Sequence, residues 1–209
     1  IQWTIAGCHS VVLVDEQLVG DPMETLALKA ISWNTSKSNV TVRTSGVRQR
    51  VEIMSRFPFS SLLKRMSTVV HIKGEFGEKF MATVKGAPEV IEQYLAVVPE
   101  SYARTHKSFS RRGLRVIALA YKPLPDITAS AVPALTRPEV ESDLIFAGFL
   151  VFDCPLKPDS LKAIEALLES SHEVVMITGD SPLTACKVAV DLKFCTKPIL
   201  LLEPSSHPD

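Results

Sequence analysis

Short apolar runs separated by turn residues dominate the first two thirds of the chain. Five stretches have the length and the apolar or alternating pattern typical of strands, at residues 9–14, 50–57, 66–74, 78–86 and 114–122. Two helices are expected between them, at 21–33 and 87–98, each with a proline near its first turn. Mostly antiparallel strands with helices packed against them predict an α+β domain, which we place at residues 1–150.

The pattern changes after a proline-rich stretch, Lys122–Ser142, that is typical of a surface loop. Apolar runs of strand length at 144–152 and 173–179 alternate with helical patterns, and a short apolar run at 198–202 suits a further strand. The two expected helices of this part lie at 157–171 and 182–194. Strands that alternate with helices predict a parallel, doubly wound sheet, so we expect an α/β domain to begin within residues 151–209.

Composition narrows the class of protein. Hydrophobic residues make up 46% and charged residues 22% of the 209 positions, as in ordinary globular proteins. Lys+Arg and Asp+Glu are equal at 23 each, so no overall charge attracts nucleic acid or an anionic membrane. The longest apolar run, 144–152, is too short to span a bilayer.

Two further features bear on the cellular setting. The four cysteines (Cys8, Cys154, Cys186 and Cys195) form no CxxC pair, which favours reduced, buried thiols in a cytosolic setting. The chain starts at Ile1 without a signal sequence, so we expect a piece excised from a longer protein.

Two predicted strands of the second part each end in an aspartate, Asp153 and Asp180. Ligands of parallel sheets bind beyond the carboxyl ends of the strands, where Thr178 adds a hydroxyl and Gly179 permits close backbone approach. A helix N-terminus follows, so these groups suit a phosphate accompanied by Mg²⁺. An equally open interpretation is that Asp180 only caps the helix and Asp153 only begins a turn before Pro155.

A second candidate is "KGAPE", Lys85–Glu89, in which a strand delivers a lysine to its end, Gly86 breaks the strand and Pro88 begins a helix. An ammonium group placed there could contact a phosphate or a purine. The chain has no GxxxxGK[ST] loop, and a solvated lysine at an ordinary strand–helix turn explains the same pattern.

A third candidate is "RFPFSSLLKRMSTVV", Arg56–Val70. Either Phe57 or Phe59 could expose its ring for stacking on a base, with Lys64 and Arg65 supplying positive charge. Phenylalanines at this spacing are more often part of a core than of a base-binding surface.

Taken together, these motifs resemble the cytosolic nucleotide-binding and phosphorylation domains of P-type ATPases. The resemblance rests on KGAPE, on F-S-x-x-x-K-x-M-S at 59–67 and on M-I-T-G-D at 176–180. Gly20–Leu28 falls where that family has an acidic helix lining the nucleotide pocket, and Phe152–Asp159 falls where it has an Asp-Pro-Pro-Arg hinge. Three stretches, at residues 56–67, 141–160 and 170–186, are most similar to the A branch of the fifth class of these pumps, which resides in the endoplasmic reticulum membrane.

The resemblance implies ATP and Mg²⁺ as cofactors and assigns a role to each matching residue. In the first domain, Phe59 would stack on adenine with Lys64 beside it, and Glu24 would face the adenine amino group. Lys85, followed by Gly86, would form the floor of the ATP pocket.

For the remaining candidates the resemblance implies contacts with the rest of the nucleotide. Arg115 would reach the phosphates and Asp153 the ribose. Thr178, Gly179 and Asp180 would steady the γ-phosphate and its magnesium during transfer, in a phosphorylation domain of the haloacid-dehalogenase type. Most ligands of that magnesium would lie outside this chain, and no metal ligand is assigned within it.

The sequence departs from the family pattern in three places. The hinge has Leu156 where an arginine is expected, and the nearby Lys157 lacks the planar guanidinium fork. The phosphorylated DKTGT motif and the magnesium-binding GDGxND motif are both absent. We therefore expect a fragment that binds ATP or ADP weakly and does not turn it over. Its expected partners are the actuator domain, the rest of the phosphorylation domain and the transmembrane domain of the parent pump.

The leading hypothesis is thus the cytosol-facing ATP-binding part of a pump that transports or dislocates transmembrane helices of proteins in the endoplasmic reticulum. Three alternatives remain open from the sequence. They are the B branch of the same class, with polyamine cargo, a soluble phosphatase of the haloacid-dehalogenase type, and a non-catalytic module that binds nucleotides or other proteins. The phosphatase would need an Asp-x-Asp nucleophile, which is not found upstream of Asp153.

Overall fold

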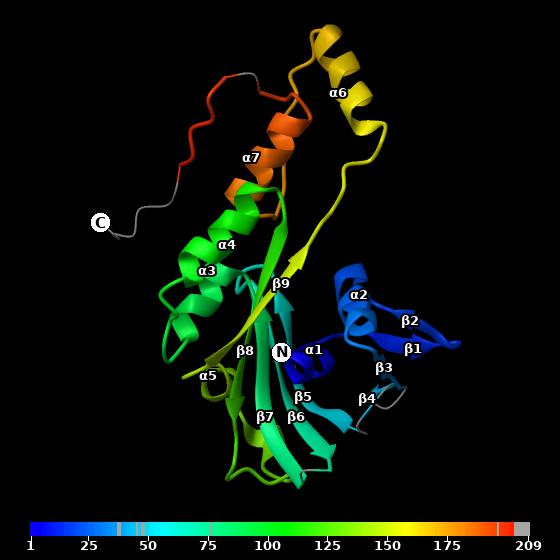
Figure 1. Ribbon diagram of the computed structural model, residues 1–209, viewed down its shortest axis with the longest axis vertical. Coiled ribbons are helices and arrows are strands. Elements are labelled where there is room, and N and C mark those ends of the chain that lie inside the picture. Colours follow the sequence, from blue (N-terminus) through cyan, green and yellow to red (C-terminus); the bar gives the residue numbers. More distant parts are fainter. Residues whose placement is uncertain (37–38, 45, 47–48, 76, 196, 203–209) are drawn as a thin grey trace. The chain divides into compact units, whose positions relative to one another are not determined.

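The computed structural model describes residues 1–36, 39–44, 46, 49–75, 77–195 and 197–202 (Figure 1). The chain divides into two compact units. The first consists of Ile1–Ala103 and Ile117–Leu150, and the second of Arg104–Val116 and Val151–Asp209.

The described residues form the following helices and strands. The helices are α1 (Gln2–Gly7), α2 (Pro22–Ala30), α3 (Pro88–Ile91), α4 (Tyr102–Arg111), α5 (Arg137–Val140), α6 (Ser160–Glu169) and α7 (Pro182–Asp191), with 3-10 turns η1 (Glu92–Tyr94) and η2 (Val132–Ala134). The strands are β1 (Val12–Val14), β2 (Gln17–Val19), β3 (Trp33–Thr35), β4 (Val40–Arg43), β5 (Gln49–Ser60), β6 (Arg65–Gly74), β7 (Gly77–Gly86), β8 (Arg115–Pro123) and β9 (Ile145–Phe152). Within the part of the chain that the structure describes, no helix is long and apolar enough to cross a membrane.

Seven strands form one sheet in the order β3-β4-β5-β6-β7-β8-β9, and β1 and β2 form a separate hairpin (Figure 1). Each neighbouring pair from β3 to β8 is antiparallel. The prediction of an α+β domain with an antiparallel sheet and flanking helices is therefore confirmed.

Alternate residues of the central strands face opposite sides of this sheet, as the strand period requires. On one side, α1 packs so closely that the Thr68 hydroxyl donates to the Gly7 carbonyl at 2.9 Å. A β-carbon at Gly7 would lie 2.6 Å from a methyl group of Val70, so only glycine fits without a shift. The other side carries an apolar cluster that includes Val84, Ala118, Ala120, Ile91, Tyr102 and Leu144, all almost fully buried.

The prediction of a parallel strand at 173–179 was wrong. No strand forms there, and the side chains of Val175 and Ile177 are 81% and 95% exposed. A parallel strand needs a partner, and the apolar run predicted for that role forms β9 beside β8 in the seven-stranded sheet. Residues 198–202 also form no strand, so the doubly wound sheet is absent from the described residues.

Helix α4 was missed by the sequence analysis. Its exposed positions carry Arg104, Lys107 and Arg111, and its buried positions include the polar residues His106 and Ser110. Tyr102, His106 and Phe109 share one face, so the helix is amphipathic, but the segment as a whole is so polar that its few apolar residues do not stand out along the sequence. The predicted loop at 122–142 is confirmed in part, since it contains η2 and α5.

His9 lies buried between α1 and β4, in an environment that keeps its ring neutral. The Val11 backbone N–H donates to Nδ1 at 3.1 Å, so Nε2 carries the proton and donates to the Thr41 hydroxyl at 3.0 Å. Burial lowers the pKa of His9 from 6.5 to about 4, against the weaker opposing effect of Glu24. Protonation of Nδ1 would also place a second N–H against the Val11 backbone N–H, so that two donors would face each other without an acceptor.

We predict that the first unit loses stability as the pH falls from 7 to 4. The unfolded chain protonates His9 near pH 6.5 while the folded chain resists until about pH 4, so the loss is about 3 kcal/mol, at about 1.4 kcal/mol for each pKa unit. Urea unfolding followed by the fluorescence of Trp3 and Trp33 measures it. His9→Gln should flatten the pH dependence, whereas the exposed control His172→Gln should retain it. An unchanged slope in His9→Gln would refute this account.

Candidate functional site

The antiparallel register brings the ends of three strands together in the first unit. Ser60 of β5 lies opposite Arg65 of β6, and Arg65 in turn lies opposite Gly86 of β7. Phe59 at the end of β5 and Lys64 in the turn before β6 therefore lie at the same end of the sheet as Gly86.

The two phenylalanines of β5 have different environments. Phe57 packs against the buried cluster around Val69 and Ala82, as the core interpretation of this pair requires. Phe59 is 61% exposed, so its ring is available for stacking on a flat ligand. The turn also exposes Lys64 and Leu62, the latter at 90%.

Lys85 and Glu24 form an ion pair at this end of the sheet. Asp21 caps α2 by accepting hydrogen bonds from the backbone N–H groups of Met23, at 2.8 Å, and Glu24, at 3.3 Å. Glu24 then directs one carboxylate oxygen to the Lys85 ammonium group and the other to the Ser10 backbone N–H, at 2.8 Å. The paired side chains are only 14% and 13% exposed, so the interpretation of Lys85 as a solvated lysine was wrong.

Gly86 is required by close packing between β7 and the turn. A β-carbon there would lie 2.7 Å from the Lys64 carbonyl oxygen and 2.8 Å from the β-carbon of Arg65. The same carbonyl accepts a hydrogen bond from the Ala87 N–H at 3.0 Å, and Lys64 itself has a positive φ of 49°. The backbone of the turn is thus attached directly to the strand end that carries Lys85.

Cys8 is buried close to this ion pair, and its thiol is not reactive. Its thiol donates to the Met66 carbonyl oxygen at 3.5 Å, and burial raises the pKa of Cys8 to about 11, although Lys85 acts in the opposite direction. The sulfur is therefore a neutral thiol and not a thiolate nucleophile at ordinary pH.

The second unit contains the remaining candidate residues. Arg115 donates to both carboxylate oxygens of Asp180, from Nε at 2.8 Å and from Nη2 at 3.0 Å. The hydrogen bonds to Asp180 raise the pKa of Arg115, so the guanidinium stays charged. The Thr178 hydroxyl accepts from the Asp180 N–H at 3.1 Å. A β-carbon added at Gly179, between them, would meet no heavy atom within 4 Å, so a side chain would fit there.

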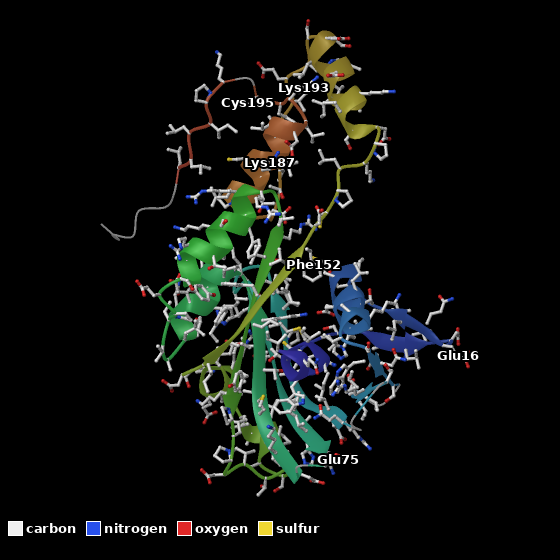
Figure 2. All side chains as sticks on the ribbon, in the orientation of Figure 1. Glu16, Glu75, Phe152, Lys187, Lys193 and Cys195 are labelled. Carbon is white, nitrogen blue, oxygen red and sulfur yellow. The ribbon has the colours of Figure 1, made fainter. Side chains whose placement is uncertain are left out.

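The structure separates the roles of Asp180 and Asp153. Ser181, not Asp180, caps α7, because its hydroxyl accepts the Thr184 N–H at 3.3 Å, so the interpretation of Asp180 as a cap was wrong. Strand β9 ends at Phe152, labelled in Figure 2, and Asp153 follows as an exposed residue. The two aspartates therefore do not end neighbouring parallel strands, as the sequence analysis expected.

The second unit is also linked internally by α7. Thr184 is buried and donates to the Leu114 carbonyl oxygen at 3.0 Å. Lys193, labelled in Figure 2 just after α7, donates to Glu165 of α6 at 2.8 Å. The first contact holds the helix that follows Asp180 to the segment that carries Arg115, and the second joins α7 to α6.

Comparison with known proteins shows which family the chain resembles. Residues 7–96 match the family model described as P-type ATPase, cytoplasmic domain N. The chain is 48% identical over 198 residues to a probable manganese-transporting ATPase, PDR2, of Arabidopsis thaliana, which covers 95% of this chain and 16% of that protein. It is 42% identical over 206 residues to the endoplasmic reticulum transmembrane helix translocase of Saccharomyces cerevisiae. This match covers 98% of this chain and 16% of that protein.

A third relative is less similar to this chain. The probable cation-transporting ATPase 13A4 of Homo sapiens is 35% identical over 204 residues, covering 88% of this chain and 17% of that protein. These matches identify the chain as a stretch of P-type ATPase sequence, with the cytoplasmic domain N over residues 7–96. The chain spans about a sixth of the length of these curated relatives.

We predict that Gly86→Ala destabilises the first unit by about 1–3 kcal/mol, because the added methyl group meets backbone atoms of the turn that cannot rotate away. Urea unfolding measures the loss. Amide chemical shifts should change over residues 60–65 and remain as in the wild type at β1 and β2. A variant as stable as the wild type, with unchanged shifts in the turn, would show that the close approach of β7 to the turn is wrong.

Proposed function

We propose that the chain binds ATP or ADP at the end of the sheet formed by β5, β6 and β7. The observation that carries this proposal is that an exposed ring, Phe59, and a shielded ion pair, Lys85 with Glu24, lie at the same end of the sheet. Lys64 adds a cation in the same turn. These groups come from distant parts of the sequence and match the groups that a purine nucleotide requires.

Each group has a defined chemical task in this proposal. The Phe59 ring stacks on the adenine face, which is worth about 1–3 kcal/mol per base in comparable sites. Glu24 accepts a hydrogen bond from the exocyclic amino group of adenine, and Lys85 turns its ammonium group to the nucleotide. A nucleotide offers both a donor and electron-rich acceptors, so neither buried charge is left without a partner when the ion pair opens.

The second unit is proposed to handle phosphate. Arg115 supplies a permanent cation, and the bidentate contact with Asp180 fixes the direction of its guanidinium fork. Thr178 and Gly179 supply a hydroxyl and an open backbone beside it, and Asp153 is proposed to contact the ribose. Charge placed in advance in this way is the main contribution that a protein makes to phosphoryl transfer.

Mg²⁺ is the proposed companion of ATP. Hard oxygen ligands suit this ion, and the Asp180 carboxylate is paired with Arg115 in this structure, so we assign it no role as a metal ligand. In this proposal the ion enters on the phosphates of the nucleotide. When bound, it neutralises the charge that develops on the transferred phosphoryl group.

For the whole protein we propose a P-type ATPase of the fifth class, A branch, in which residues 1–150 form the nucleotide-binding domain and residues 151–209 form part of a haloacid-dehalogenase-like phosphorylation domain. ATP hydrolysis through an aspartyl phosphate would drive the transport or dislocation of transmembrane helices in the endoplasmic reticulum membrane, with this part facing the cytosol. The support is the similarity to helix translocases at 42% identity or more in Saccharomyces cerevisiae and Aspergillus fumigatus. Nothing in the structure or the comparisons favours the polyamine branch.

We predict that ADP binds to the 209-residue chain and that Phe59→Ala weakens binding about 5- to 100-fold, the equivalent of one lost stacking contact. Calorimetric titration measures the affinity. Leu62→Ala is the matched control, because Leu62 is exposed in the same turn without a proposed contact. Equal losses in the two variants, or none in Phe59→Ala, would remove the ring from the site.

Lys85→Ala should weaken ADP binding by at least about tenfold, because the nucleotide loses a cation and meets the unpaired Glu24 carboxylate. Lys79→Ala is the control, since Lys79 lies on the same strand and its ammonium group stands 3.7 Å from the Trp3 ring centroid. ATP should be bound and not hydrolysed, because the 209 residues contain no DKTGT aspartate. Unaltered affinity in Lys85→Ala, or phosphate release by the wild-type chain, would contradict the proposal.

A further inference from the structure

A buried carboxylate lies behind the turn that carries Phe59 and Lys64. Glu141, at the end of α5, is 1% exposed. One of its oxygens accepts hydrogen bonds from the Ser67 hydroxyl at 2.6 Å and from Arg137 Nη1 at 3.1 Å, and the other accepts from Arg65 Nε at 2.6 Å. A buried charge with this many charged and polar partners is well compensated and held in one position.

Both arginines also bind the backbone of the turn. Arg137 Nη2 donates to the Pro58 carbonyl oxygen at 2.8 Å, and Arg65 Nη1 donates to the Leu63 carbonyl oxygen at 3.3 Å. Pro58 immediately precedes residues 59–64, which are the last two residues of β5 and the turn that follows, and Leu63 lies just before the last of them. The two ends of the turn are therefore fixed by two guanidinium groups that share one buried carboxylate.

Local structure and ring contacts restrict these arginines further. Thr136 and Glu139 form a capping box that begins α5 at Arg137. Arg137 and Glu141, four residues apart, therefore lie on the same face of this helical turn. The Arg65 guanidinium lies 4.3 Å from the Tyr94 ring centroid, and that of Arg137 lies 5.7 Å from the Phe57 ring centroid.

The turn itself makes little use of side-chain packing. Phe59 and Leu62 are 61% and 90% exposed, so apolar burial does not determine where the Phe59 ring stands. Contacts to the backbone remain to determine it. They are the two arginine contacts and two backbone hydrogen bonds, from the Lys64 N–H to the Ser60 carbonyl oxygen at 2.7 Å and from the Ala87 N–H to the Lys64 carbonyl oxygen, and of these only the Arg137 contact lies immediately before Phe59.

We infer that Arg137, held by Glu141, is a positioning residue for nucleotide binding. It fixes the carbonyl group immediately before Phe59 and so presents the ring in a single orientation before the purine arrives, which lowers the entropy cost of binding. Arg65 does the same for Lys64 at the other end of the turn. This inference rests on the proposed nucleotide function of Phe59.

The test compares ADP affinity in the wild-type chain and in Arg137→Met by calorimetry. We expect binding about tenfold weaker in Arg137→Met, since the ring must be ordered when the nucleotide binds. Arg137→Lys, which keeps the charge but lacks the planar fork whose two nitrogens bind Glu141 and Pro58, should give an intermediate affinity. Binding of inorganic tripolyphosphate, which has no purine, should be the same in all three proteins.

Lys122→Met is the matched control. Lys122 also binds the α5 region from a neighbouring strand, donating to the Glu139 carbonyl oxygen at 3.1 Å and to the Ser142 hydroxyl at 2.9 Å. It binds no carbonyl group of the turn among the described residues, so its removal should leave ADP affinity unchanged. A loss equal to that in Arg137→Met would mean that general loosening of α5, not positioning of the turn, explains the effect.

A double-mutant cycle decides whether Arg137 acts through the ring. In a Phe59→Ala background, Arg137→Met should cause no further loss of ADP affinity. A loss as large as that in the wild-type background, or wild-type affinity in the single variant, would overturn the inference. If Arg137→Met does not fold, Arg137→Lys takes its place in the cycle, and wild-type affinity in that variant overturns the inference equally.

The proposed function and this inference fail in different ways. A wild-type chain that binds no ADP contradicts the nucleotide function of the site and, with it, the role of Arg137. A wild-type chain that binds ADP through Phe59 but is indifferent to Arg137 contradicts the positioning role alone.

Discussion

The antiparallel register of β5, β6 and β7 is the constraint on which the site depends. Ser60 opposite Arg65, and Arg65 opposite Gly86, place the ends of three strands at one level. Because Gly86 has no β-carbon, the end of β7 approaches the Lys64 carbonyl oxygen closely enough for the next residue to bind it. A register shift by one residue would turn the Lys85 side chain to the opposite face, away from Glu24.

Charge compensation is the second principle of the structure. Lys85 is paired with Glu24, Glu141 with two arginines, and Asp180 with Arg115. The pairs in the first unit are largely shielded from water, so breaking one without replacing its contacts is costly. In the proposed function, the ligand is therefore one that brings its own donor and its own acceptors, because these can replace both halves of the Lys85–Glu24 pair.

The sequence predicted the parts of the fold that local signals define. Alternating apolar residues marked β5 to β8, a proline marked the start of α2, and the glycine after Lys85 marked the end of β7. The apolar run at 173–179 led to a wrong prediction of a parallel strand, because an apolar run indicates burial but does not specify a partner strand. The expected partner, β9, pairs with β8 instead. Glu141 gave no signal at all: one of its partners, Arg65, is 76 residues away, and it follows a proline-rich loop that suggests only a solvated surface. Interactions of this kind depend on tertiary contacts that neither period nor spacing encodes.

The central claim is that the purine ring lies against Phe59 at the end of the sheet. Intermolecular nuclear Overhauser effects between ADP and the isotope-labelled 209-residue chain test it most directly, because they depend on proximity alone and involve no mutation. The account predicts contacts from the adenine H2 and H8 protons to the ring protons of Phe59 and to the side chain of Lys85. Contacts instead to the exposed valines of the β1–β2 hairpin, with none to Phe59, would contradict it.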